Sequence, residues 1–132
     1  MGSHRPSSAP RTDGRRLTAR LGEIWYGYVG PERKRRVIIV SREELNRGAY
    51  ATIVPITSRR FELRKKLPNC VPLFAGRFGL TKNCVAQAEN ITLVRHSDLD
   101  FESGPLAELD AITLRAVVKA IGNVIGADCE MI

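Results

Sequence analysis

The stretch Arg35-Arg36-Val37-Ile38-Ile39-Val40-Ser41 decides the fold, because two arginines lead there into four consecutive β-branched residues. A short, continuous apolar run of this kind is typical of a strand that is buried on both faces. Aromatic or β-branched runs lie on either side of it, and glycine, proline or polar residues separate them. We therefore predict further strands over residues 23–29, 50–57, 71–74, 84–88 and 91–94.

One proline and one polar segment interrupt this predicted sheet. Pro55 lies inside the run 50–57 and has no N–H to give to a strand ladder, so we expect it at a sheet edge or at a bulge. Residues 43–47 are polar and precede Gly48, and we expect them to form a single helical turn.

The C-terminal third has a helical period. Its apolar residues recur at steps of mostly three and four, which places them on one face of a helix. They are Leu106, Leu109, Ile112, Leu114, Val117, Val118, Ile121, Val124 and Ile125. Ser103 can cap this helix, Pro105 suits its first turn and Gly126 can end it. Strands followed by one long helix predict an α+β fold, most simply a small, strongly bent β-barrel of five to seven strands with a C-terminal helix.

The length of 132 residues corresponds to one domain, which we place at residues 21–126. Residues 1–20 are polar and rich in Pro, Ser and Arg, so we expect a flexible basic tail. Its first four residues, Met-Gly-Ser-His, have the form of a cloning remnant. Residues 127–132 are expected to be a short C-terminal tail.

Several classes of protein do not fit this composition. The sequence has no uncharged apolar run of about 18 residues and no N-terminal apolar segment of the signal-peptide type. Its three cysteines, Cys70, Cys84 and Cys129, are odd in number and contain no C-x-x-C pair, which argues against a disulfide framework and a zinc site. We therefore expect a soluble, cytoplasmic protein that does not associate with membranes and needs no metal or cofactor.

Charge is distributed unevenly along the chain. Residues 1–82 contain 18 basic and 6 acidic residues, whereas residues 83–132 contain 3 and 8, and the net charge is +7. Two basic clusters, at 33–36 and 59–66, flank predicted strands. If the fold brings them together, they form a patch that can neutralise several phosphates; the alternative is that each cluster is a solvated loop end.

The side chains favour basic and hydroxyl chemistry over hydrolytic triads. The sequence has two histidines, His4 and His96, and no G-x-S-x-G motif. RNA carries its own nucleophile, the 2′-OH, so fixed arginine and hydroxyl groups can assist its cleavage. Arg35 and Thr57 lie at ends of neighbouring predicted strands and are candidates for this role, although both can instead belong to solvated turns.

Trp25 and Tyr26 are consecutive in a predicted strand, so one faces the core and the other faces outward. The outward ring can stack on a base or pack in a core or dimer interface.

Five segments resemble, in unbroken order over about residues 21–125, motifs of the MazF/PemK toxin family. The block R-P-V-L-V-V-S-x-x-x-x-N-R is similar to residues 35–47, and the opening G-[DE]-[IV]-[WY]-[WY] is similar to residues 22–26. The strand end V-P-[IL]-T-S resembles residues 54–58, G-L-x-K-x-S-V-A resembles residues 79–86, and [DE]-Q-[IV] resembles residues 89–91. Together these motifs are specific.

The resemblance implies the toxin of a type II toxin–antitoxin system, a homodimer built on an SH3-like barrel with a C-terminal helix. It implies a sequence-specific, metal-independent endoribonuclease that cleaves single-stranded mRNA through attack by the 2′-OH. A cognate antitoxin whose tail fills the RNA groove is the implied partner, and no cofactor is implied.

The resemblance also suggests roles for individual residues. Arg35 matches the catalytic arginine of the family and Thr57 its catalytic threonine. Arg36 stands where the family has proline and adds a cation. The residues expected to contact RNA are Arg33, Lys34, Arg36, Ser58, Glu89 and Asn90.

Two departures from the family pattern leave other functions open. Residues 30–34 form a shorter loop than the family's G-S-E-Q-x-G segment, and Asn90 replaces glutamine. One alternative is therefore a catalytically weak RNA-binding module. The other is a gyrase-targeting toxin of the CcdB branch, although that branch acts through a C-terminal Trp-Gly-Ile and this chain ends Cys129-Glu130-Met131-Ile132.

Overall fold

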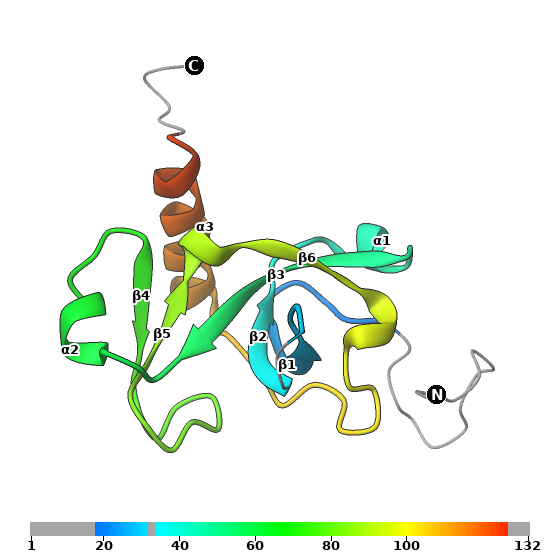
Figure 1. Cartoon of the computed structure of the whole chain (residues 1–132), viewed down its shortest axis with the longest axis horizontal. Coiled ribbons are helices and arrows are strands. Elements are labelled where there is room, and N and C mark those ends of the chain that lie inside the picture. The colour runs from blue at the N-terminus through cyan, green and yellow to red at the C-terminus, as the bar shows by residue number, and fades with distance from the viewer. Residues whose placement is uncertain (1–17, 32–33, 127–132) are drawn as a thin grey trace.

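The computed structural model describes residues 18–31 and 34–126. In this part of the chain, seven strands form one curled antiparallel sheet, and a long helix lies at the C-terminal end (Figure 1). The strands are β1 (Glu23–Tyr28), β2 (Lys34–Ile39), β3 (Tyr50–Thr57), β4 (Cys70–Leu73), β5 (Cys84–Gln87), β6 (Thr92–Arg95) and β7 (Ala107–Glu108). The helices are α1 (Glu43–Asn46), α2 (Phe61–Arg64), α3 (Ala111–Ile125) and the short 3-10 turns η1 (Ala88–Asn90) and η2 (His96–Asp98). The predicted α+β class is confirmed.

The long strand β3 joins the two sides of the curled sheet. The order of strands in the sheet is β4-β5-β3-β2-β1-β7. The remaining strand, β6, pairs with the first half of β3. The register with β6 ends at Ile53, and the register with β5 begins at Ile56. Pro55 lies between these two partners, so of the two places we expected, an edge or a bulge, the edge was wrong: β3 is central, and the proline falls where its neighbour changes.

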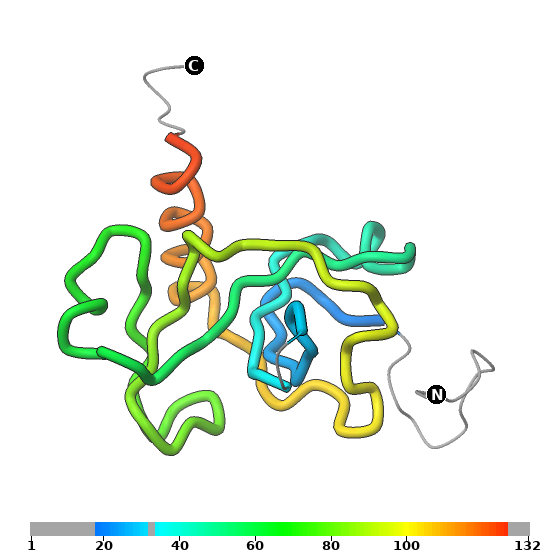
Figure 2. Tube along the Cα trace, in the orientation of Figure 1, coloured from blue at the N-terminus to red at the C-terminus, as the bar shows by residue number. Residues whose placement is uncertain are grey.

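Strand β2 is buried on both faces, as predicted. Ile38 belongs to a core cluster that packs under α3, while Val37 and Ile39 belong to a second cluster around Trp25. The segment that follows β6 runs back alongside β1 (Figure 2), where Leu99 bridges to Gly27 and closes the second cluster. The curl of the sheet therefore allows one strand to supply two cores.

The C-terminal helix begins later than its apolar period predicts. It starts at Ala111, and the side chain of Asp110, rather than Ser103, caps it by accepting a hydrogen bond from the backbone N–H of Thr113. Leu106 and Leu109 precede the helix because their backbone N–H groups donate to β1 and to Gly22, so this segment adds to the sheet. The predicted end is confirmed, since Gly126 adopts a left-handed C-cap conformation.

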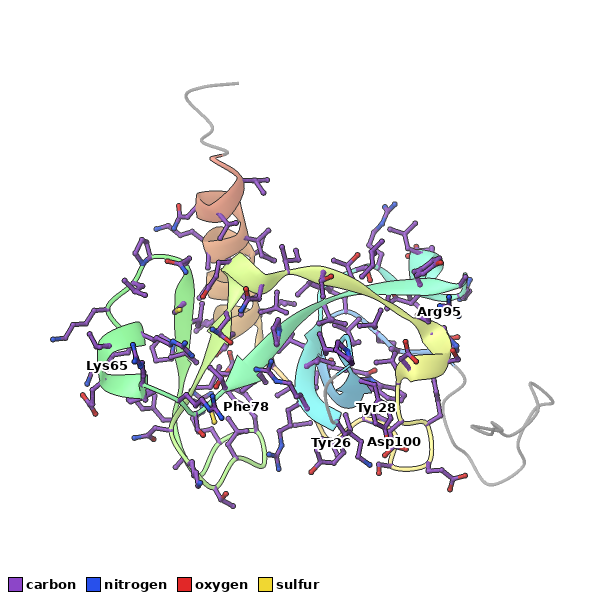
Figure 3. All side chains as sticks on the ribbon, viewed as in Figure 1. Tyr26, Tyr28, Lys65, Phe78, Arg95 and Asp100 are labelled. Carbon is purple, nitrogen blue, oxygen red and sulfur yellow. The ribbon has the colours of Figure 1, made fainter. Side chains whose placement is uncertain are left out.

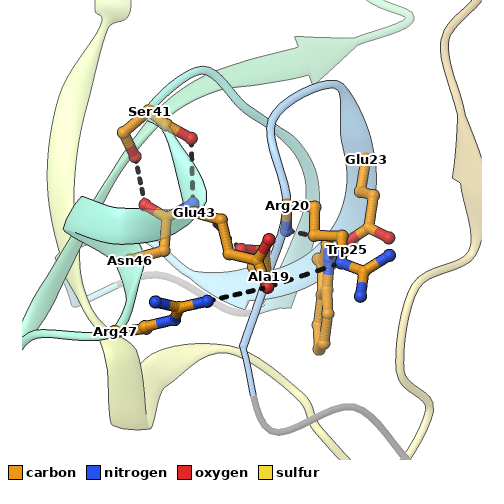
Figure 4. Close-up of polar contacts among 8 residues, drawn as sticks. All are labelled: Ala19, Arg20, Glu23, Trp25, Ser41, Glu43, Asn46 and Arg47. Atoms are coloured by element: carbon orange, nitrogen blue, oxygen red, sulfur yellow. Dashed lines mark hydrogen bonds and ion pairs between the residues drawn. The ribbon is translucent and has the colours of Figure 1, made fainter.

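A buried polar network ties the start of the fold to α1 (Figure 4). Asn46 is fully buried; its Nδ2 donates to the backbone oxygen atoms of Ala19 (3.0 Å) and Ser41 (2.9 Å), and its Oδ1 accepts from Ser41 Oγ. Beside it, Glu23 Oε1 accepts hydrogen bonds from Trp25 Nε1 (3.0 Å) and the backbone N–H of Arg20 (2.8 Å). Ala19 and Arg20, which we expected in the tail, thus pack against the domain.

The remaining tail residues, 1–17 and 127–132, lie outside the described residues. None of the helices in the described part is both long and apolar enough to cross a membrane.

Candidate functional site

A groove with a volume of about 720 Å³ opens where β1, β2, β3 and β5 end or turn into loops. We call it the basic groove. Its lining residues are Tyr26, Lys34, Arg35, Arg36, Ile56, Thr57, Ser58, Arg59, Arg64, Leu80, Thr81, Lys82, Cys84, Gln87 and Asn90.

Every charged residue that lines the basic groove is a cation. Lys34, Arg35 and Arg36 come from the first predicted basic cluster, and Arg59 and Arg64 come from the second. The fold therefore joins the two clusters, and Lys82 adds a sixth positive charge. A concave surface lined by charge of one sign concentrates its field in the groove, which attracts a polyanion.

Arg35 and Thr57 both line this groove, and their strands β2 and β3 are neighbours in the sheet. The guanidinium Nη2 of Arg35 donates to the carbonyl oxygen of Ile56 at 3.3 Å, which fixes the cation next to the residue that precedes Thr57. Thr57 Oγ1 accepts a hydrogen bond from the backbone N–H of Arg59 at 3.2 Å. This bond within a local turn holds the Thr57 oxygen in place. It uses one lone pair of the hydroxyl, so the O–H of Thr57 can still donate to a ligand. The geometry brings the two residues together; their catalytic roles stay predictions.

An aromatic ring supports the first two cations of β2. Lys34 Nζ lies 5.1 Å and Arg36 Cζ lies 5.4 Å from the centre of the Tyr26 ring, within the range of cation–π attraction. Trp25, by contrast, is fully buried, so the predicted alternation of the two aromatic residues is confirmed. Because two cations lie over its ring, Tyr26 serves to hold positive charge at the groove wall.

Lys34 is also tethered by the carboxylate of Asp100, which lies in the loop after η2 (labelled in Figure 3). Its Nζ donates to Asp100 Oδ2 at 3.1 Å, and this hydrogen bond raises the pKa of Lys34. Burial alone would raise the pKa of Asp100, but hydrogen bonds from Lys34 and Ser103 hold it below its ordinary value. The pair fixes one cation at the rim of the groove.

The other predicted contact residues fall at different places. Ser58 and Asn90 line the basic groove, whereas Glu89 does not: its carboxylate accepts hydrogen bonds from Asn69 and Gln87. Arg33 lies outside the described residues. The predicted site thus contains Arg36, Lys34, Ser58 and Asn90 at the groove and Glu89 beside it.

Sequence reasoning missed several lining residues. Lys82 and Thr81 lie within a segment quoted for the family resemblance, but the pattern alone gave them no role. Gln87 lies in the predicted strand 84–88, which gives it no role by itself, yet it is buried and lines the groove. Gln87 is identified by its burial: every residue of β5 is buried, and a buried amide needs hydrogen-bond partners.

Cys84 is a buried small side chain that also forms part of the groove wall. Burial raises the pKa of its thiol despite the nearby Arg36 and Lys82, so it is not an activated nucleophile. Within residues 18–31 and 34–126, no three histidine, cysteine or acidic side chains form a group that could hold a metal ion.

Comparisons with solved structures agree with this fold. The toxin MazF-mt6 of Mycobacterium tuberculosis is 25% identical, with a TM-score of 0.68 over 80% of this chain and 98% of its own. An endoribonuclease in complex with its cognate antitoxin, from a mycobacterial species, is 22% identical with a TM-score of 0.67, covering 83% and 97%. A MazE-MazF structure from Deinococcus radiodurans is 23% identical with a TM-score of 0.65, covering 84% and 98%. The last two, at their lower identity, support the fold alone.

A comparison with curated protein sequences gave no significant match. The family model of the PemK-like, MazF-like toxins of type II toxin–antitoxin systems matches residues 20–125, which is most of the chain and all of the basic groove. Together with the structural matches, this shows that the chain belongs to the PemK-like, MazF-like family of type II toxins.

Proposed function

We propose that this toxin is a sequence-specific, metal-independent endoribonuclease that cleaves single-stranded mRNA in the cytoplasm through attack by the 2′-OH. Toxins of the MazF family are endoribonucleases, and this family membership supports the general reaction. The observation that carries the finer proposal is the position of Arg35 beside Thr57 in a groove with six lining cations.

The proposed reaction needs no chemical group beyond the RNA and the side chains. The 2′-oxygen bonds to phosphorus and the bond to the 5′-oxygen breaks, while the proton lost by the 2′-OH and the proton gained by the 5′-oxygen exchange with solvent. The products are a 2′,3′-cyclic phosphate and a 5′-OH. Negative charge grows on the phosphoryl oxygens in the transition state, and donors that are already fixed there stabilise it most.

Arg35 and Thr57 suit this role for separate reasons. The planar guanidinium of Arg35 can meet two phosphate oxygens at once, and its bond to the Ile56 carbonyl already orients it. The hydroxyl of Thr57 can donate to a phosphoryl oxygen while Arg59 N–H holds it in place. Since orientation is set before the substrate arrives, little reorganisation is needed during the reaction.

The remaining groove residues would hold the strand of RNA. Lys34, Arg36, Arg59, Arg64 and Lys82 can neutralise phosphates, which supplies affinity without reading sequence. Ser58 and Asn90 carry neutral polar groups that can contact sugar or base edges.

We further infer that the toxin is a homodimer and that a cognate antitoxin inhibits it. The structural matches include an endoribonuclease with its cognate antitoxin and MazE-MazF structures, which supports such a partner. An acidic antitoxin segment in the basic groove would compete directly with RNA, because both need the same cations.

The test is cleavage of single-stranded RNA by purified protein in EDTA, with mass analysis of the fragment ends. We expect 2′,3′-cyclic phosphate or its hydrolysis product, and a loss of about 10²-fold or more in rate for both Arg35→Ala and Thr57→Ala. Thr57→Ser keeps the hydroxyl and should retain most of the activity. Arg115→Ala, on the exposed side of α3, is the matched arginine control.

Three results would contradict the proposal. Full activity in Arg35→Ala and Thr57→Ala would exclude these roles, and a strict requirement for a divalent metal would exclude the proposed chemistry. Binding of RNA that falls steeply with salt, without any cleavage, would instead favour a binding module.

A further inference from the structure

Gln87 is a buried amide in the wall of the basic groove. It is the last residue of β5, it is only 5% exposed, and its backbone pairs with Cys70 of β4. It falls between the two family motifs at residues 79–86 and 89–91 and belongs to neither. A polar side chain at a buried strand position costs free energy unless its hydrogen bonds are made, so its presence calls for a physical reason.

One end of this amide is held by the protein. Gln87 Nε2 donates to Glu89 Oε2 at 3.4 Å, and the other carboxylate oxygen of Glu89 accepts from Asn69 Nδ2 at 2.6 Å. Asn69 is itself fixed, because its backbone oxygen accepts from the N–H of Ala88 at 3.0 Å. Glu89 therefore determines which way the Gln87 amide faces.

The other end of the amide has no partner among the described residues. No donor among residues 18–31 and 34–126 bonds to Gln87 Oε1. In the same part of the chain, no fully enclosed side-chain nitrogen or oxygen lacks a hydrogen-bond partner, so this oxygen reaches solvent. Since Gln87 lines the basic groove, its small exposed part is the carbonyl end, which faces the groove as an acceptor.

We propose that Gln87 reads one base of the bound RNA through this oriented carbonyl, and that Glu89 is its positioning residue. The proposal rests on the proposed function, because it assumes that the ligand of the groove is single-stranded RNA. Each base has a donor, either an exocyclic amino group (adenine, cytosine, guanine) or a ring N–H (guanine, uracil), and these donors lie at different places on the base edge; a fixed acceptor therefore favours the base whose donor meets it. The cations of the groove bind any sequence, whereas this neutral group discriminates.

The experiment is a binding selection with a randomised single-stranded 2′-fluoro RNA library. Such RNA has no 2′-OH to attack, so the measured base preference does not depend on cleavage. For the wild type we expect one base to be enriched about fivefold over the others at one position, a size typical of one hydrogen bond between neutral groups. Gln87→Met has a similar length but lacks the carbonyl, and it should bring this ratio close to one.

Two further variants separate base reading from general effects. Glu89→Ala removes the acceptor that orients the amide, so the preference at the same position should weaken although Gln87 is present. Lys82→Met should reduce binding to all sequences alike and leave the base profile unchanged, because a phosphate contact carries no sequence information. Thermal unfolding of each variant shows whether the fold is retained.

The proposal is overturned if the wild type selects no base at any position, or if Gln87→Met, correctly folded, keeps the wild-type profile. These outcomes are distinct from a failure of the proposed function, which would appear as an absence of cleavage of ordinary RNA by the wild type. If the protein selects bases but cleaves no RNA, the base-reading role of Gln87 stands and the proposed endoribonuclease activity does not.

Discussion

At one end of β2, Arg35 and Arg36 face the basic groove together with four other lining cations and without a lining carboxylate. Just beyond the other end of the same strand, Ser41 and Asn46 are buried, neutral and bonded to each other and to Ala19. Both pairs belong to one continuous block of sequence, residues 35–47, and β2 itself spans Lys34–Ile39. The strand therefore separates two polar regions by only a few residues.

The difference lies in whether the polar groups are satisfied within the chain. In the Ser41–Asn46 network each buried polar atom has a partner, so the network stabilises the fold and leaves nothing to offer a ligand. In the basic groove, Lys34 is the one lining cation that forms an ion pair with another described residue, and the remaining positive charge attracts an external anion. Changes in the first region should thus affect stability, and changes in the second should affect activity.

The largest effect is expected for Arg35→Lys, which keeps the charge and loses the planar fork. We expect the rate of RNA cleavage to fall by about 10²-fold, because one ammonium cannot replace two parallel donors to a phosphate. Single-turnover cleavage measures this, and the free energy of unfolding should stay close to that of the wild type. Arg115→Lys on α3 is the matched control. A rate within threefold of the wild type would mean that Arg35 acts as charge alone.

Asn46→Ala tests the opposite region. It removes the partners of the Ser41 hydroxyl and of two buried backbone oxygens, and we expect a loss of about 3 kcal/mol in the free energy of unfolding. Urea denaturation measures it, with Asn123→Ala as the control, since exposed Asn123 makes one bond, to Pro68 O at 3.1 Å. Cleavage by the folded fraction should be nearly unchanged; a folded but inactive variant would remove the distinction between the two regions.

Lys82→Met should have a moderate effect on the groove. For single-stranded RNA, the slope of log affinity against log salt changes by about 0.7 for each phosphate contact. We therefore expect the slope to become shallower by about that amount, measured by titration of a labelled RNA at several salt concentrations. Lys119→Met, on the exposed side of α3, should leave the slope as it is. An unchanged slope for Lys82→Met would place Lys82 outside the path of the RNA.

The smallest effect is expected for Asp100→Asn, which weakens the tether of Lys34 and can retain the acceptor oxygen bonded by the N–H groups of Glu102 and Ser103. Because the pKa of Asp100 is lowered in the folded state, its contribution to stability is present at neutral pH and is lost as the pH falls through that lowered value. The unfolding curves of the two proteins should differ slightly at pH 7 and converge well below about pH 4, the ordinary pKa of an aspartate. A gap that widens on acidification would contradict this sign.

Most strands could be predicted because their runs are bounded by clear turn residues. β3 has the predicted limits, and β4 is displaced by one residue from the predicted 71–74. The start of α3 could not be found, because Leu106 and Leu109 continue the helical spacing while their backbone pairs with the sheet. Only the tertiary partner distinguishes the two conformations. The turn α2 was missed for a related reason: four residues carry too little periodicity to mark a helix.

Some residues of the candidate site could be predicted from local sequence patterns, and others could be found only in the folded structure. Arg35 and Thr57 could be named because they stand at strand ends within family motifs. The sequence left open whether the two basic clusters meet, and the folded groove settles this. The bond of Asp100 to Lys34 joins residues 66 positions apart, and no local pattern announces it. Gln87 could be recognised only once its burial and its single unpartnered oxygen were known.

The change of neighbours along β3 has a mechanical consequence. The partner of β3 changes at Val54 and Pro55: the residues before them are paired with β6, and the residues after them are paired with β5. Thr57 is therefore paired with β5, whereas Arg35 lies on β2, whose register with β3 extends to Pro55. The hydrogen bond from Arg35 Nη2 to the Ile56 carbonyl crosses the point where β3 changes neighbours, so it couples the guanidinium to the part of the sheet that carries Thr57.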